Sequence, residues 1–117
     1  MCYPWTVIEL LEYVDAVGVS PFAKWREKLD PSMRARVTVA IFRLEVGNFS
    51  AVKGVGGGVF ELRMDFGPGY RAYFGKDGEK LIVLLGGGTK KRQQADIETA
   101  QKLWQVYKRS KRGLSGP

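Results

Sequence analysis

Apolar residues in the first part of this chain predict one strand followed by two helices. Thr6–Tyr13 is rich in β-forming residues broken by glutamates, which predicts a first strand. Ser20-Pro21 and Asp30-Pro31 each place a capping residue before proline, the usual start of a helix. The second apolar stripe has helical spacing and ends before Gly47. We therefore expect a helical hairpin after the first strand.

After Asn48 the spacing of apolar residues changes to alternation, which predicts a sheet. Val59–Phe66 and Tyr70–Phe74 are predicted to form an antiparallel hairpin around the turn Gly67-Pro68-Gly69. A three-residue turn would pair Phe66 with Tyr70, Asp65 with Arg71, and Arg63 with Tyr73.

The last part of the pattern predicts one more strand and one more helix. The unbroken apolar run Leu81–Leu85 indicates a central strand buried on both faces, and a helix is predicted to begin near Asp96. The expected fold class is α+β, with an antiparallel-rich twisted sheet carrying its helices on one side. We expect a single domain over residues 1–112 and a flexible tail over residues 113–117.

The net charge of this chain is +7, and it is concentrated near the C-terminus. Residues 89–117 hold eight basic and two acidic residues, which places +6 of the +7 there. Such a field suits a polyanion such as RNA, although a solubilising tail would show the same charge. No apolar run approaches the ~18 residues of a membrane span, and no signal peptide is evident, so we expect a cytoplasmic protein without membrane contact.

The residue types present exclude several kinds of active site. The chain has no histidine and a single cysteine, Cys2, which excludes Ser-His and Cys-His triads, histidine metal sites and zinc clusters. The glycine runs at Gly54–Gly58 and Gly86–Gly88 lack the spacing of a phosphate-binding loop, and we interpret them as turns and strand terminators. No cofactor is expected.

One polar face of the predicted hairpin contains candidate functional residues. Glu61, Arg63, Arg71 and Tyr73 would share this face, with Lys53, Lys90 and Gln93 on flanking segments. Arginines can clamp a phosphate, and a tyrosine can stack on a base or carry a proton. Alternation alone rather favours an ordinary solvated face with ion pairs.

The motifs on these strands resemble those of a known family. The string Val59–Phe74, Leu84–Lys90, Gln93, Asp96-Ile97 and Ala100, in this order and spacing, is similar to the addiction-module killer proteins. These are phage-derived, HigB-like members of the RelE/ParE toxin superfamily. The resemblance covers residues 6–107.

The resemblance implies a RelE-like fold and a toxin that stops growth, usually by cleaving mRNA and often on the ribosome. It also implies a partner antitoxin, commonly a helix-turn-helix DNA-binding protein. Two departures from the family are Thr89-Lys90-Lys91 in place of Asp-Lys-Ser, and the lack of a C-terminal catalytic histidine. The expected catalytic residues are Glu61, Arg63, Arg71, Tyr73 and Lys90, and the expected RNA-binding residues are Lys53, Lys91, Arg92, Gln93, Lys108 and Arg109.

The chemistry expected of this set is a metal-independent attack of an RNA 2′-hydroxyl on the adjacent phosphate. Arg63 and Arg71 would stabilise the phosphate charge, while Glu61, Tyr73 or Lys90 would move protons. Tyrosine titrates near ~10, so Tyr73 would need a lowered pKa to act as a base, and we expect nearby cations to lower it. Two alternatives stay open: a DNA gyrase inhibitor, and a non-catalytic nucleic-acid-binding module that binds phosphates without cleavage.

Overall fold

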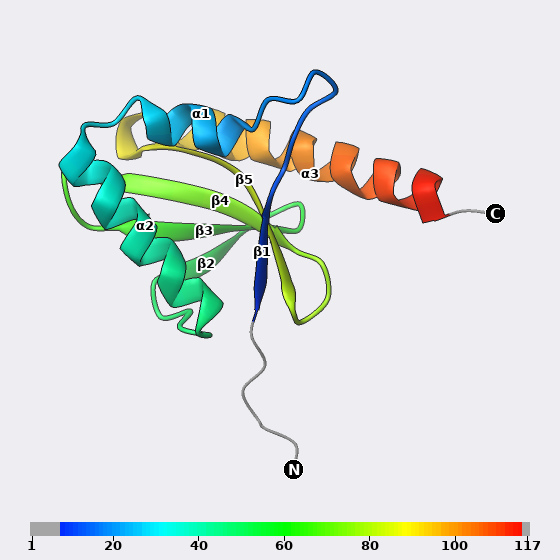
Figure 1. Ribbon diagram of the computed structural model, residues 1–117, viewed down its shortest axis with the longest axis horizontal. Coiled ribbons are helices and arrows are strands. Elements are labelled where there is room, and N and C mark those ends of the chain that lie inside the picture. The colour runs from blue at the N-terminus through cyan, green and yellow to red at the C-terminus, as the bar shows by residue number, and fades with distance from the viewer. Residues whose placement is uncertain (1–7, 116–117) are drawn as a thin grey trace, which may run out of the picture.

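The computed structural model describes residues 8–115 and forms a five-stranded sheet with helices on both faces (Figure 1). The strand order is β1-β5-β4-β3-β2, with β1 parallel to β5 and the other neighbours antiparallel. This mixed α+β architecture agrees with the expected fold class and with a RelE-like fold. The elements in chain order are β1 (Glu9–Glu12), α1 (Pro21–Glu27), α2 (Pro31–Glu45), β2 (Val52–Gly56), β3 (Val59–Met64), β4 (Tyr70–Lys76), β5 (Leu81–Thr89), the 3-10 turn η1 (Lys90–Arg92) and α3 (Gln93–Ser115).

The two predicted helix starts are confirmed. The Ser20 side chain accepts a hydrogen bond from the Ala23 amide at 3.1 Å, and the Asp30 side chain accepts one from the Met33 amide at 3.0 Å. Each of these hydrogen bonds satisfies a backbone amide that has no partner within the helix. The proline that follows each capping residue has no amide hydrogen and therefore needs no partner. The strand and helix ends differ from the prediction in detail. Strand β1 begins at Glu9 and ends at Glu12, one residue short of the predicted Tyr13, and Thr6 and Val7 lie outside the described residues.

The predicted register of the β3–β4 hairpin is wrong by two residues. Arg63 pairs with Arg71, Glu61 pairs with Tyr73, and Met64 pairs with Tyr70. The connection is therefore a five-residue loop, residues 65–69, and not a three-residue turn. Because a shift of two residues keeps every side chain on its face, the predicted polar face still forms.

The expectation that all helices lie on one side of the sheet is also wrong. Helices α1 and α2 cover one face, where Phe22, Leu44 and Phe74 are buried, and α3 covers the other, where Ala100 and Trp104 are buried. The apolar stripe of α3 can leave water only by packing on the second face. Strand β4 is consequently buried on both sides from Tyr70 to Gly75. Strand β5 is likewise interior, as its apolar run predicts.

The glycines at positions 86–88 lie inside β5, whereas the sequence suggested strand terminators. All three pair with β4, and Gly87 and Gly88 allow helices to approach the sheet closely. A Cβ on Gly87 would overlap the ring of Trp25 from α1, and one on Gly88 would overlap the carboxylate of Asp96 from α3. The turn interpretation of the other glycine run, Gly54–Gly58, is correct only in part. Gly54 and Gly56 belong to β2, a strand that the sequence did not predict, and the turn to β3 follows at Gly57 and Gly58, with positive φ angles from Gly56 to Gly58.

Helix α3 begins earlier and ends later than expected. It starts at Gln93, directly after η1, and runs to Ser115. Residues 113–115, expected as part of a flexible tail, are thus helical, and residues 116 and 117 lie outside the described part of the chain. In Figure 1 the C-terminal half of α3 continues to the right beyond the strands.

Candidate nucleic-acid interface

Three strands and the start of α3 meet at one end of the sheet. Strand β3 ends there, β4 begins there, and β5 ends there before η1 leads into α3. The Lys90 amide donates a hydrogen bond of 2.8 Å to the Gly69 carbonyl, so η1 lies directly beside the β3–β4 loop. The three basic residues of η1, Lys90, Lys91 and Arg92, are all exposed at this end.

A buried carboxylate holds four elements together beneath this surface. One oxygen of Glu61 lies 3.7 Å from Lys53 Nζ of β2 and 3.7 Å from Arg71 Nε of β4. Its other oxygen accepts a hydrogen bond of 2.7 Å from Gln93 Nε2, the first residue of α3. The Glu61 side chain is 1% exposed. Glu61 therefore positions its neighbours and is not itself open to solvent.

The cations around Glu61 differ greatly in their exposure. The side chain of Lys53 is 66% exposed and that of Arg63 is 59% exposed, whereas that of Arg71 is only 8% exposed. Arg63 and Arg71 are direct cross-strand partners on the same face, so their side chains are neighbours. The arrangement is a cationic surface with one buried arginine beneath it, whose Nε lies near Glu61 as an ion pair and has no hydrogen bond within residues 8–111.

Tyr73 does not have the lowered pKa that its cationic neighbours led us to expect. Burial in the sheet raises the pKa of Tyr73 well above its usual value, and the carboxylates of Glu61 and Asp96 raise it further, while Arg71 opposes them. Its hydroxyl is buried, and within residues 8–111 no group meets it with the geometry of a hydrogen bond, so Glu61 acts on it mainly through its charge. Tyr73 stays protonated at neutral pH and cannot serve as a base there.

Two carboxylates near this site were not among the predicted site residues. Asp65 is exposed and lies 3.4 Å from Arg63 Nε. Asp96 lies over Gly88 and lines a cavity of about 100 Å³ that also contacts Tyr73; burial raises its pKa, and Arg92 opposes the shift. Asp65 directly follows β3, and in the sequence it continues the alternation of Glu61 and Arg63, so this signal was available there. The position of Asp96 depends on the packing of α3, which the sequence pattern does not specify.

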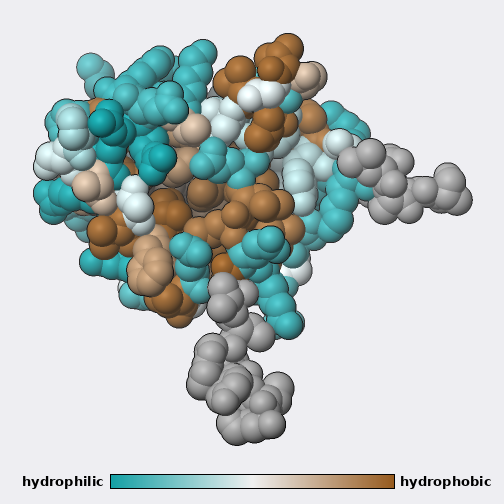
Figure 2. All heavy atoms as spheres, in the orientation of Figure 1, coloured by the Kyte–Doolittle hydropathy of each residue, from teal (hydrophilic) through white to brown (hydrophobic). Residues whose placement is uncertain are grey.

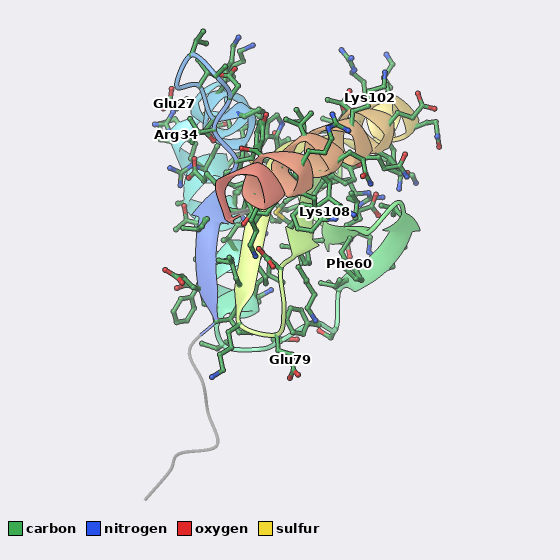
Figure 3. All side chains as sticks on the ribbon, turned by 90° about the vertical axis from the view of Figure 1, so that its right-hand side faces the viewer. Glu27, Arg34, Phe60, Glu79, Lys102 and Lys108 are labelled. Atoms are coloured by element: carbon green, nitrogen blue, oxygen red, sulfur yellow. The ribbon has the colours of Figure 1, made fainter. Side chains whose placement is uncertain are left out.

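Lys108 and Arg109 are not brought to this site. They lie on α3 about 22–24 Å beyond Gln93, at ~1.5 Å of rise per residue. The Lys108 ammonium instead lies 5.8 Å from the ring centre of Trp104, and Arg109 is exposed. Figure 3 shows Lys102 and Lys108 along this helix. The predicted RNA-binding set is thus divided between the start of α3 and its far half.

Comparison with known proteins identifies the family of this chain. Residues 24–108 match the model of the family described as phage derived protein Gp49-like (DUF891). The chain belongs to this Gp49-like family. Its members are RelE/HigB-like toxins of toxin-antitoxin systems, which implies a cognate antitoxin as partner. A relative from Haemophilus influenzae, named only as an uncharacterized protein, is 42% identical over 85 residues, which cover 72% of this chain and 86% of the relative.

None of the helices in the described part of this Gp49-like chain is long and apolar enough to cross a bilayer. Within the same residues, no three side chains of histidine, cysteine, aspartate or glutamate come together as metal ligands.

Proposed function

We propose that this Gp49-like protein is a toxin of the HigB-like branch that cleaves mRNA on the ribosome in the cytoplasm, without a metal ion. The observation that supports this most directly is the cluster of cations at the start of α3. Lys53, Arg63 and Lys90 are open to solvent there, and Arg71 is fixed by the buried Glu61. A phosphodiester backbone is the polyanion that such a surface suits.

Phosphate binding at this site would use both side chains and backbone. The exposed guanidinium of Arg63 and the ammonium of Lys53 can contact phosphate oxygens directly. The positive end of the α3 dipole points to the same place and favours negative charge. Arg71 would act from below, with its orientation set by Glu61.

The proposed reaction is attack of the 2′-oxygen of a ribose on the neighbouring phosphorus. The P–O5′ bond breaks, and the products are a 2′,3′-cyclic phosphate and a 5′-hydroxyl. We assign Arg63 and Arg71 to the developing charge on the phosphate, and the protons to groups that solvent reaches. Asp65 would accept the 2′-hydroxyl proton and the Lys90 ammonium would donate one to the leaving 5′-oxygen. Glu61 and Tyr73 are buried, and in this proposal they position the cations.

The test is cleavage of a defined mRNA in a reconstituted translation reaction, with and without ribosomes, read by mapping new 5′ ends. We expect cleavage only with ribosomes, and a loss of about 10²-fold or more for Arg63→Ala, because a charge-stabilising contact is removed. The matched control is Arg109→Ala, which removes another exposed arginine far along α3 and should cleave normally. Arg71→Ala is less informative, because it leaves the buried carboxylate of Glu61 without its buried counter-ion and so also destabilises the fold.

Either of two results would refute the proposed function. Intact mRNA in both reactions, from a protein that still arrests growth, would favour the gyrase alternative. Intact mRNA together with RNA binding that falls steeply with salt, and no growth arrest, would favour a non-catalytic binding module.

A further inference from the structure

Helix α2 has a second apolar stripe that nothing in the described chain covers. Its buried side packs on the sheet through Val37, Ala40, Ile41 and Leu44. On the opposite side, Val39, Phe42 and the C-cap residue Val46 are each more than half exposed, and Ala35 is also exposed. The spacing of these four residues alternates between four and three, which is the a/d spacing of a coiled-coil seam. We refer to Ala35, Val39, Phe42 and Val46 as the α2 seam.

Grooves run along both sides of the α2 seam. The larger, of about 470 Å³, lies between α2 and β3, and the smaller, of about 240 Å³, lies between α2 and the β1–α1 side of the molecule. Figure 2 shows apolar surface on this side of the molecule, bordered by hydrophilic side chains. Exposed apolar residues scattered singly are ordinary, but a continuous stripe with a groove on each side is typical of a docking surface.

The charges beside the α2 seam are of one sign on its β3 side. Arg36 and Arg43 occupy the two flanking positions there. They are seven residues, or about two helical turns, apart, and both line the larger groove. Within residues 8–111 neither forms an ion pair, and Arg36 is instead held over the ring of Phe66, 4.4 Å from its centre. Flanking cations that lack a carboxylate partner in the described residues favour an opposing helix with acidic flanks.

We propose that the α2 seam binds an amphipathic helix of the cognate antitoxin, with its apolar residues on the seam and glutamate or aspartate opposite Arg36 and Arg43. The identity of the partner rests on the toxin function proposed above, whereas the binding chemistry does not. A second copy of this chain fits less well, because antiparallel pairing of two α2 helices would bring Arg36 of one copy near Arg43 of the other.

The position of the larger groove also links this surface to the candidate site. The groove is lined by Arg63, which belongs to the cationic surface at the start of α3. A helix on the α2 seam with an acidic flank would therefore lie beside Arg63 and compete with RNA for it. Inhibition would then follow from occupancy of one edge of the cationic surface, without unfolding of the toxin.

The test uses two labelled helical peptides of about three heptads with identical apolar a and d positions. One carries glutamate at its flanking positions and the other carries lysine, and binding is measured by fluorescence anisotropy. We expect this protein to prefer the acidic peptide by at least about tenfold, Arg36→Glu/Arg43→Glu to reverse the preference, and Phe42→Ser to abolish binding of both peptides. The matched control is Lys102→Glu/Arg109→Glu on α3, which changes the net charge equally and should keep the acidic preference.

Equal binding of the two peptides, or reversal by the α3 control pair, would overturn the proposal, since only the general charge would then matter. Sedimentation of the protein as a dimer that Phe42→Ser dissociates would assign the seam to a second copy instead. The mRNA cleavage assay separates this proposal from the proposed function. Phe42→Ser should cleave as the wild type does, and a protein that binds the acidic peptide but never cleaves mRNA would refute the endonuclease alone.

Discussion

Replacing Glu61 by glutamine tests whether the buried carboxylate holds the candidate site together. The substitution keeps the size of the side chain and removes its charge, which leaves the guanidinium of Arg71 buried without a counter-ion. Loss of one partner of a buried ion pair costs about 3–5 kcal/mol. The contribution of Lys53 is at most about 1 kcal/mol, because its side chain is largely in solvent. Since glutamine can still contact Gln93, we expect a loss near the lower limit, about 3 kcal/mol.

Urea unfolding at pH 7, followed by far-ultraviolet circular dichroism, measures this loss as a lower midpoint at unchanged slope. The melting temperature should fall by about 12 °C, at about 4 °C per kcal/mol for a chain of this length. Asp65→Asn is the control, because it removes the carboxylate of an exposed ion pair with Arg63 just beyond the end of β3 and should cost less than about 1 kcal/mol.

A double variant decides whether the stranded cation is the cause. In Glu61→Gln/Arg71→Met the buried charge is gone. The double variant should therefore lose less stability than the two single variants together, by about 1–3 kcal/mol. A Glu61→Gln protein within about 0.5 kcal/mol of the wild type, or strictly additive losses, would refute this account of the site.

Three further outcomes follow from the packing on the α3 face. Gly75→Ala should destabilise the protein by about 2 kcal/mol or more, because its Cβ would overlap the ring of Trp104, whereas Gly86→Ala meets nothing within 4 Å and should stay within about 0.5 kcal/mol in the same unfolding assay. Because the pKa of Tyr73 is raised on folding, its contribution to stability is present below pH ~10 and is lost as the pH rises through the folded-state pKa. Tyr73→Phe should therefore flatten the fall in stability measured above pH ~10, and an unchanged slope would contradict the assigned burial. Trp104→Ala should cost about 3–5 kcal/mol, as expected for loss of a buried tryptophan, and a smaller loss would indicate that α3 packs only weakly on the sheet.

The elements of this fold were largely readable from local signals. Ser20-Pro21 and Asp30-Pro31 predicted both helix starts, since a cap and a proline act within one turn of chain. Alternation in Val59–Phe66 predicted the polar face that Glu61 and Arg63 share, although β3 itself ends at Met64. The register was not readable, because the loop length that fixes it depends on how residues 65–69 pack, and Gly-Pro-Gly suggested a tighter turn than the one observed.

The site was only partly predictable for a related reason. Strand order and alternation bring Arg63, Arg71 and Tyr73 together, but they do not show which of these side chains solvent reaches. That depends on α3, whose apolar stripe identifies it as a packed helix without saying which face of the sheet it covers. The raised pKa of Tyr73 follows from the same packing, because burial by α3 outweighs the neighbouring cation.

Local pattern and charge in this chain were therefore sufficient for its fold class, its cationic character and most of its elements, since each depends on residues close together along the chain. The exception is β2, Val52–Gly56, whose glycines suggested a turn. The tertiary structure alone decided that Glu61 is a buried tie between four elements, that Tyr73 stays protonated, and that Lys108 and Arg109 lie away from the other candidates. These properties arise between segments far apart in sequence, where desolvation and distance are set by packing.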